Sequence, residues 1–448
     1  MSGAMGWIKS NLPIVGMSAA IVVVLPAAWV GSKMWNTSIR KAQEVRADKD
    51  LSQLKTANVA YRVDPVVPDA PPIEWSGPPN PRITEFFAKT KEEMEGEAKV
   101  VAESAQRTNR GDHRPLIEGL FPTPTGSSLD VKNKAIDMAR LIVPSGDPAN
   151  PTAYERLLTE IGAGGPPEAS VVAQVVSDLV ESERMRIQAE RGSPTLTADE
   201  QKQLTEKLIA RRIGEYQRRA QEVSVYADIS IFPPPKKGMW TGIPAREPDR
   251  PAEVEKLFEW QFDYWTFREV LRAVTAANVD AEGERVAASE APVKRIMTVN
   301  VQQLPIYAEN ALRLSAGDDL TPYSPGEMIP ADYTESFTGR RSRAKNHLYD
   351  VRMAQVGLVV SSSRVKEVVE AMQRSNFVTV TDVDLRAIDP WSHLREGYFY
   401  GTEHVVEATV TLETVWLRSW TTGLMPGIVR YALGMDVPVE AGGEDDDR

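Results

Sequence analysis

Cysteine is absent from the 448-residue chain, and histidine occurs only four times. The absence of cysteine excludes disulfide bonds, thiolate metal sites and cysteine nucleophiles, although it does not fix the compartment. Basic residues are outnumbered: 52 Lys and Arg stand against 63 Asp and Glu, so the net charge is −11. Binding to nucleic acid needs a basic face that contacts phosphates. The composition therefore argues against nucleic acid as the main partner.

Recognisable catalytic motifs are missing as well. No GxSxG, Walker A or GxGxxG stretch stands in a strand-turn-helix context. The glycine-rich stretch Gly162–Pro167 lacks the Lys-Ser/Thr ending of a phosphate loop, and we interpret it as a turn. We therefore predict a protein that is not an enzyme, with no catalytic, cofactor-binding or metal-binding residues, no cofactor and no small-molecule substrate.

Two groups of residues come nearest to a chemical site. Four residues could be assembled into a metal site on paper: His393, Glu396, Glu403 and His404. Their spacing matches no helical HExxH pattern, and His404 is predicted to start a strand. Asp382 and Asp384 alternate with Val383 on a predicted strand, so they share its solvent face. Such pairs arise by chance in a chain this rich in acids, and neither group is assigned a chemical role.

The N-terminal region contains one long hydrophobic run. Leu12–Val30 comprises 19 residues without a charge, and as a helix it would be about 28 Å long, close to the hydrocarbon thickness of a bilayer. Trp7, Trp29 and Trp35 lie near its ends, as interfacial anchors do. We predict a transmembrane helix that contacts the lipid bilayer through residues 12–30. The alternatives are a buried soluble helix and a cleaved signal peptide, although Trp29 occupies the place where cleavage needs small residues.

A charged segment and a proline-rich segment follow the hydrophobic run. Ser38–Val59 is helix-prone with a sparse apolar stripe. It predicts either a short coiled stalk or a solvated helix, because it has fewer than the three or four heptads that identify a coiled coil. Pro65–Pro81, PVVPDAPPIEWSGPPNP, predicts an extended polyproline II spacer, with a PxxP ligand motif as the alternative.

The next part of the chain, residues 82–227, is predicted to be mostly helical. The expected helices are Ile83–Thr108, Leu129–Ile142, Tyr154–Ile161, Ala169–Ala189 and Thr197–Tyr226. Thr197 and Glu200 have the spacing of a capping box at the start of the last helix. The stretch Arg184–Arg219 is dense in both charges and typical of a solvated helix face, with a membrane-surface or acidic-partner patch as the alternative.

The C-terminal region predicts a strand, a helix and two further strands. The predicted strands are Val351–Val360, Phe377–Leu385 and Val406–Trp416. The last of them alternates apolar and polar residues, which predicts one buried and one wet face. Apolar residues at i, i+3, i+4 and i+7 from Val365 predict a helix with one apolar face. Ser363 is its predicted N-cap, and Asn376 is its predicted stop.

A similar pattern lies upstream. Ala252–Asn278 is predicted to be a helix with an aromatic-rich stripe, and Val293–Pro305 alternates like a strand. With the strand at Val351, the order is helix-strand-strand twice, which predicts one sheet covered by two helices, a ferredoxin-like α+β sandwich. Gly317–Arg343 would connect the middle strands. Trp420–Met435 predicts a short apolar helix packed on the sheet, with an exposed docking segment as the alternative.

The order of these elements resembles a known family. A short N-terminal tail, one hydrophobic span, a charged stalk and a terminal αββ-αββ unit resemble the PilO-like and type II secretion M-type inner-membrane assembly proteins, including the PilO-like pilus-associated proteins of the Akkermansia group. The resemblance covers roughly residues 7–60 and 252–418 and rests on element order. It implies a bacterial inner-membrane scaffold that forms a homo- or hetero-dimer with a related membrane protein. The helical insertion departs from the family pattern.

Two considerations about membrane orientation disagree. Lys9 flanks one side of the span, whereas Lys33, Arg40, Lys41 and Arg46 flank the other. The positive-inside rule therefore places the C-terminal bulk in the cytoplasm. The resemblance implies that the bulk is periplasmic. We follow the resemblance, because a short tail is most simply left inside, and the cytoplasmic orientation stands as the alternative.

Together these patterns predict an α+β protein with an N-terminal single transmembrane helix and stalk, a helical middle region and a C-terminal ferredoxin-like αββ-αββ sandwich. The predicted segments are 1–31 (tail and transmembrane helix), 32–64 (stalk), 65–81 (Pro-rich linker), 82–230 (helical region), 231–251 (Pro-rich loop), 252–436 (ferredoxin-like domain) and 437–448 (acidic disordered tail). The predicted function is a non-enzymatic single-pass scaffold of a pilus or type II secretion-like assembly. The alternatives are a membrane-tethered binding module of an unrelated envelope system and a tethered hydrolase with an unrecognised site.

Overall fold

The computed structural model describes residues 3–66, 70–147, 149–192, 196–235, 240–303 and 348–432. The chain divides into two compact units, Met1–Ser104 and Ala105–Arg448, with the boundary inside helix α3 (Pro81–Arg110). Helices account for 56% and strands for 17% of the structure, so the protein belongs to the predicted α+β class. The predicted connection at Gly317–Arg343 and the acidic tail at 437–448 lie outside the described residues.

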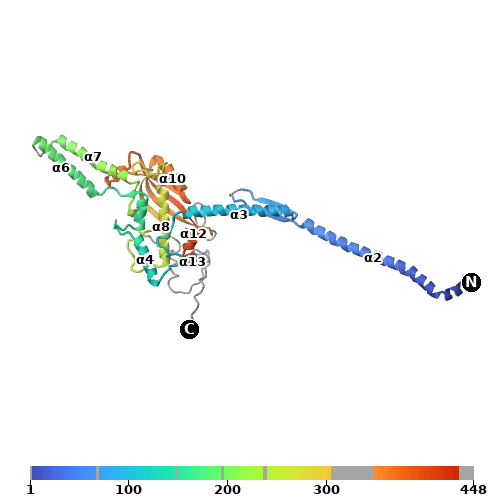
Figure 1. Cartoon of the computed structure of the whole chain (residues 1–448). Coiled ribbons are helices and arrows are strands. Elements are labelled where there is room, and N and C mark those ends of the chain that lie inside the picture. The colour runs from blue at the N-terminus through green and yellow to red at the C-terminus, as the bar shows by residue number, and fades with distance from the viewer. Residues whose placement is uncertain are drawn as a thin grey trace, which may run out of the picture. The chain divides into compact units, whose positions relative to one another are not determined.

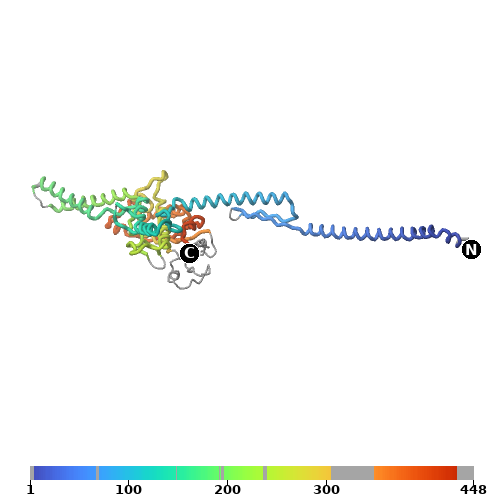
Figure 2. Tube along the Cα trace, turned by 60° about the horizontal axis from the view of Figure 1, so that its bottom comes forward, coloured from blue at the N-terminus to red at the C-terminus, as the bar shows by residue number. Residues whose placement is uncertain are grey.

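The first unit begins with helices α1 (Gly3–Ser10) and α2 (Leu12–Thr56). Pro13 stands in the first turn of α2, where its missing N–H has no intrahelical partner to lose. The helix continues without a break through the predicted transmembrane segment and most of the predicted stalk (Figure 2). Its apolar window has a mean hydropathy of 2.2, and none of that window is buried within the protein. The chain thus contains one helix that is long and apolar enough to span a membrane.

A β-hairpin follows α2 in the same unit. Strands β1 (Val59–Val63) and β2 (Ile73–Gly77) pair antiparallel. Tyr61 of β1 stacks on Phe87 of α3 at 5.2 Å between ring centroids, and its hydroxyl lies 2.5 Å from the Thr84 hydroxyl. The predicted polyproline II spacer is therefore wrong at Ile73–Gly77, because backbone pairing with β1 and the packing of β1 on α3 place this stretch in a hairpin.

The second unit is built on one sheet, whose strand order among the described residues is β3-β4-β6-β7-β9-β8, with β5 paired to the end of β6. The strands are β3 (Ala163–Gly164), β4 (Val225–Tyr226), β5 (Trp240–Thr241), β6 (Val293–Gln302), β7 (Tyr349–Ser361), β8 (Val378–Ala387) and β9 (Val405–Leu417). The pairs β6–β7, β7–β9 and β9–β8 are antiparallel, whereas β3–β4 and β4–β6 are parallel. The short parallel strands therefore join the predicted helical region to the sheet.

Helix α8 (Val254–Thr275) lies at the centre of this unit. Its side chains are buried on nearly every face, including Phe258, Trp265 and Leu271 at 0–1% exposure. They share one hydrophobic core with the sheet and with helices α4 (Ser128–Ile142) and α5 (Ala153–Glu160), and α4 lies beside α8 (Figure 1). Side chains from residues 82–230 and from 252–436 pack into this common core. Whether the two regions are separate domains that fold independently stays a prediction.

Helices α6 (Ala169–Arg191) and α7 (Ala198–Glu222) pack against each other and extend away from the rest of the second unit in both views (Figures 1 and 2). The predicted capping box is confirmed: the Thr197 hydroxyl accepts from the Glu200 amide, and the Glu200 carboxylate accepts from the Thr197 amide. The predicted continuation of this helix to Tyr226 is wrong, because Val225–Tyr226 pairs with β3 and β6 as strand β4.

Helix α10 (Val365–Arg374) has the predicted buried face, with Val368 and Met372 at 2% and 0% exposure. Its predicted N-cap, Ser363, is wrong, because Ser362–Arg364 forms a 3₁₀ turn that places Arg364 at the cap position. Asn376 follows the helix end closely, as predicted.

The predicted wet face of β9 ends before Glu413, which is only 3% exposed. Its neighbours in the sheet are Met353 on β7 and Thr379 on β8, so the Glu413 side chain is flanked by a strand on each side. Beyond β9, helices α12 (Arg418–Thr421) and α13 (Gly427–Ala432) bring Trp420, Met425 and Val429 into the core. Packing of this segment is therefore confirmed for the described residues.

Candidate functional site: the polar core around helix α8

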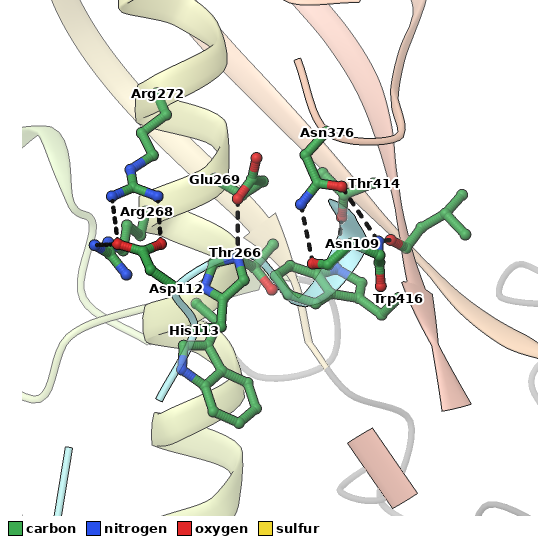
Figure 3. Close-up of polar contacts among 12 residues, drawn as sticks. Asn109, Asp112, His113, Thr266, Arg268, Glu269, Arg272, Asn376, Thr414 and Trp416 are labelled. Carbon is green, nitrogen blue, oxygen red and sulfur yellow. Dashed lines mark hydrogen bonds and ion pairs between the residues drawn. The ribbon is translucent and has the colours of Figure 1, made fainter. Parts of the chain in front are cut away.

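The last turn of α3 is attached to the sheet through Asn109, whose side chain is 1% exposed. Its Nδ2 donates to the Val415 carbonyl at 2.7 Å, and its Oδ1 accepts from the Leu417 amide and from Trp420 Nε1, both at 2.8 Å. In return, the Asn376 side-chain amide donates to the Asn109 carbonyl at 3.0 Å (Figure 3). One asparagine thus satisfies three polar groups at the end of β9 and the start of α12.

Three residues further on, Asp112 binds two arginines of α8. Its carboxylate lies 2.6 Å from an Arg268 guanidinium nitrogen and 2.7 Å from one of Arg272 (Figure 3). Arg272 also binds Glu160 of α5 at 2.6 Å. The hydrogen bond from Arg272 and the nearby charge of Arg268 hold the pKa of the Asp112 carboxyl well below its usual range. The two arginines occupy one face of α8 because they are four residues apart.

His113 lies in an aromatic enclosure and is 2% exposed. Its Nε2 forms a hydrogen bond with the Glu269 carboxyl group at 2.9 Å (Figure 3). The ring is stacked with Trp420 at an interplanar angle of 2° and also contacts Trp265 and Trp416. His113 Nδ1 has no hydrogen-bond partner among the described residues. Through these contacts, His113 connects α8, β9 and α12 to the segment that follows α3.

A second buried charge pair crosses from the sheet to α8. Arg352 of β7 is 0% exposed, and its Nη2 lies 2.6 Å from Asp263 Oδ1. The Arg352 guanidinium also donates to the Thr266 hydroxyl at 3.1 Å and to the Gln302 carbonyl, while Thr241 donates to the other Asp263 oxygen. Both Asp263 oxygens and both terminal nitrogens of the Arg352 guanidinium thus have partners, which helps to offset the cost of burying the two charges, whereas Arg352 Nε has none among the described residues.

Glu259 adds a second carboxylate one turn before Asp263 and is 0% exposed. It pairs with Lys256, and Gln303 donates to its other oxygen at 3.4 Å. Burial and the neighbouring Asp263 charge raise the pKa of Glu259 to about 6. The folded protein therefore holds this proton more tightly than the unfolded chain does.

We expect Glu259→Gln to make the protein less sensitive to pH. A raised folded pKa gives stability that is full below pH 4.5, the ordinary glutamate value, and is lost as pH rises through about 6. Above pH 7 the neutral variant should be more stable than the parent by on the order of 1–2 kcal/mol, whereas below pH 4.5 the two should converge. Urea unfolding of the full-length protein at several pH values measures this. The exposed Glu253→Gln should unfold like the parent, and a Glu259→Gln curve parallel to that of the parent would contradict the assignment.

The four residues weighed as metal ligands do not converge. Their partners are Tyr400 for His393 at 2.7 Å, Arg295 for Glu396 at 3.8 Å and Lys294 for Glu403 at 3.2 Å, while His404 precedes β9. In the described part of the chain no group of three His, Asp or Glu residues is arranged to hold a metal ion. Asp382 and Asp384 are both exposed on β8, as predicted, and Asp384 pairs with Arg386 at 2.9 Å.

No local sequence pattern identifies the groups that organise this core. Asn109 and Asp112 carry no local signature, because their partners are far away in the sequence. One signal was present on α8, where polar side chains interrupt an aromatic-rich helix: Glu259, Gln261, Asp263, Thr266 and Glu269. Buried polar groups require partners, so a helix this apolar with that many of them predicts a polar network across its interface.

Comparisons with known proteins add little to this geometry. No family model matches the sequence, and no curated protein matches it. A crystal structure from Akkermansia muciniphila is similar at 11% identity, covering 65% of this chain and 96% of that chain, with a TM-score of 0.24. At such a TM-score the similarity supports no inference about fold or function.

Proposed function

We propose that the chain is a non-enzymatic, single-pass membrane scaffold of a pilus or type II secretion-like assembly that acts through protein–protein contacts of its C-terminal domain. The observation that carries the proposal is the apolar part of α2. Leu25 and Trp29 are 63% and 67% exposed there, and no residue of the helix is buried. A continuous apolar surface of this length is unfavourable in water and favourable in a bilayer.

We further propose that the C-terminal domain is ferredoxin-like. The order α8-β6-β7-α10-β8-β9 supports this designation, with the short helix α11 (Pro390–Arg395) between the last two strands. The four long strands are antiparallel in the order β6-β7-β9-β8, so the last strand inserts between the second and the third. An αββ unit repeated twice produces this arrangement when the two hairpins pair side by side.

The ionisable groups in the core of the second unit support a structural role for that core. Buried ionisable side chains are paired with each other across elements: Arg352 with Asp263, His113 with Glu269, and Arg418 with Asp350. Removal of one partner of such an ion pair would leave the other charge buried and unpaired, which is strongly destabilising. Because these buried ionisable groups are occupied by contacts between elements, their role is structural. This supports the proposal that the chain is a scaffold and not an enzyme.

The proposed location is the bacterial inner membrane, with the C-terminal bulk in the periplasm. The stalk part of α2 exposes four apolar side chains that would suit pairing with another helix: Ile39, Val45, Leu51 and Leu54. Paired stalks would bring two heads together above the membrane, which supports a dimer of this chain or with a related protein.

A second candidate function is favoured by the α6–α7 hairpin. It extends from the rest of its unit (Figure 1) and exposes Val171, Met185 and Ile209 at 50–59%. Apolar side chains on a projecting helical arm are typical of a recognition surface. A membrane-tethered binding module of an unrelated envelope system would use this arm as its receptor surface.

Fractionation of cells that produce the full-length chain tests the proposed function. We expect the chain to remain in the membrane pellet after alkaline extraction and to migrate in complexes larger than the monomer after mild solubilisation. The variant that lacks residues 1–31 should move to the soluble fraction, because it lacks the apolar helix. A full-length chain in the soluble fraction, or only monomers after gentle solubilisation, would contradict the proposal.

A further inference from the structure

We infer that the outer edge of β8 pairs with the same edge of a second copy of this chain, antiparallel and centred on Leu385. The inference rests on the proposed scaffold function and names its partner and its contact surface. Two sheets joined in this way would form one continuous sheet across a two-fold axis.

The edge of β8 has the properties that this pairing requires. It is the last strand of the sheet and pairs only with β9 among the described residues. Exposure rises along the strand, from 4% at Val378 to 49% at Leu385. Leu385 and Val383 stand opposite Ala408 and Val410, which are buried, so Leu385 belongs to the core face of the sheet. A leucine on the core face is thus half exposed at a sheet edge that no described strand covers.

Charge order along the strand selects one register. A two-fold axis perpendicular to the sheet keeps the core faces of both copies on the same side. Directly opposed residues then lie on the same face, and because side chains alternate between faces, one residue of β8 must stand opposite its own copy at the axis. With Leu385 at the axis, Asp384 stands opposite Arg386 of the second copy, and the same pair forms again on the other side. Val383 then meets Ala387 on the core face. Both opposed charge pairs are attractive.

Neighbouring registers oppose like charges. An axis at Val383 places Asp382 against Asp384 of the second copy, and an axis at Asp384 or Arg386 places each of these residues against itself. Like charges that are directly opposite destabilise a strand pair. The register centred on Leu385 is therefore the one of these four in which every opposed charge has the opposite sign.

Edge strands are often protected against pairing by bulges and charges. Strand β8 has a bulge between Val380 and Asp382, but the pairing with β9 is regular from Asp382 to Ala387. Charges of a single sign would repel in every register that opposes them, whereas Asp384 and Arg386 face each other across the two-fold axis when Leu385 lies on it. The segment 383–387 is thus suited to one antiparallel partner, a second copy of itself.

Single-cysteine crosslinking in membranes that contain the full-length chain tests the inference, because the chain has no cysteine of its own. We expect Leu385→Cys to give a homodimer with a short bifunctional maleimide, since directly opposed side chains have Cβ atoms about 5 Å apart. The matched control is Lys366→Cys on α10, where the parent side chain is 88% exposed and does not belong to the strand that is proposed to pair. It should stay monomeric under the same conditions.

A charge exchange tests the register. In the Leu385→Cys background, Asp384→Arg or Arg386→Asp alone should weaken self-association by about tenfold, because two attractive cross-strand pairs become repulsive. The double variant Asp384→Arg/Arg386→Asp restores both attractions and should recover the crosslinked dimer. Recovery by the double variant separates the register from a loss of folding.

Each outcome decides the inference. A Leu385→Cys monomer in a chain that still sediments with membranes in larger complexes would overturn the β8 pairing and leave the scaffold function standing. A Leu385→Cys crosslink to a different protein would overturn the second copy as partner, and charge reversals without effect would overturn the register. A full-length chain that leaves the membrane would contradict the proposed function itself.

Discussion

Arg352→Met is expected to destabilise the full-length protein by about 3–5 kcal/mol, because it removes one partner of a buried ion pair and leaves the other charge uncompensated. Asp263 is 2% exposed and would retain only hydroxyl donors such as Thr241. The Gln302 carbonyl and the Thr266 hydroxyl would lose a donor in addition. Urea unfolding in detergent, followed by tryptophan fluorescence, measures the loss.

Two variants control this experiment. Arg374→Met removes an arginine whose side chain is 79% exposed and paired with Glu370, so it should change the free energy of unfolding by less than about 1 kcal/mol. The double variant Arg352→Met/Asp263→Leu removes both charges and should recover most of the loss, since an apolar replacement of a buried pair is close to neutral. A loss below about 1 kcal/mol for Arg352→Met alone would refute the central role of this pair.

Asn109→Ala is expected to have the second large effect, on the order of 3 kcal/mol or more. It leaves the Val415 carbonyl, the Leu417 amide and Trp420 Nε1 without their partner in a buried environment, and each such group costs about 1–3 kcal/mol. The effect should also be local. Hydrogen exchange should accelerate first at residues 105–113, which Asn109 attaches to β9.

The control for this change is Asn133→Ala on α4, which makes the same substitution at an exposed position. It should alter neither the unfolding midpoint nor the exchange at residues 105–113, because surface substitutions outside special features are usually close to neutral. Uniform acceleration of exchange across the second unit of Asn109→Ala, without an early change at 105–113, would show that Asn109 is only one core residue among many.

The long elements of this fold could be predicted from the sequence because their periodicity is local. Alternation in β6 and β9 and the spacing of Val368 and Met372 in α10 depend on residues a few positions apart. The two-residue strands β3 and β4 are too short to show any period. They are strands because they pair with each other and β4 pairs with β6, which no local pattern reports.

The polar core could not be predicted for a similar reason. Asn109 and Val415 are 306 positions apart, and Asp112 and Arg272 are 160 apart. Their pairing depends on the packing of α3, α8 and β9, and a single sequence contains no record of that packing. The burial of α8 on nearly every face could be anticipated from its aromatic content, but which side chain meets which charge could not.

Strand β9 lies between β7 and β8 although it is the last of the described strands to be synthesised. Until residue 417 has left the ribosome, β7 and β8 have no shared neighbour. The edge of β7 that will pair with β9 has no partner strand until then. If α2 spans a membrane as proposed, its apolar part would have entered the bilayer before that point. The head would therefore complete its sheet while already attached to the membrane, and until then its unpaired strands would be a target for chaperones.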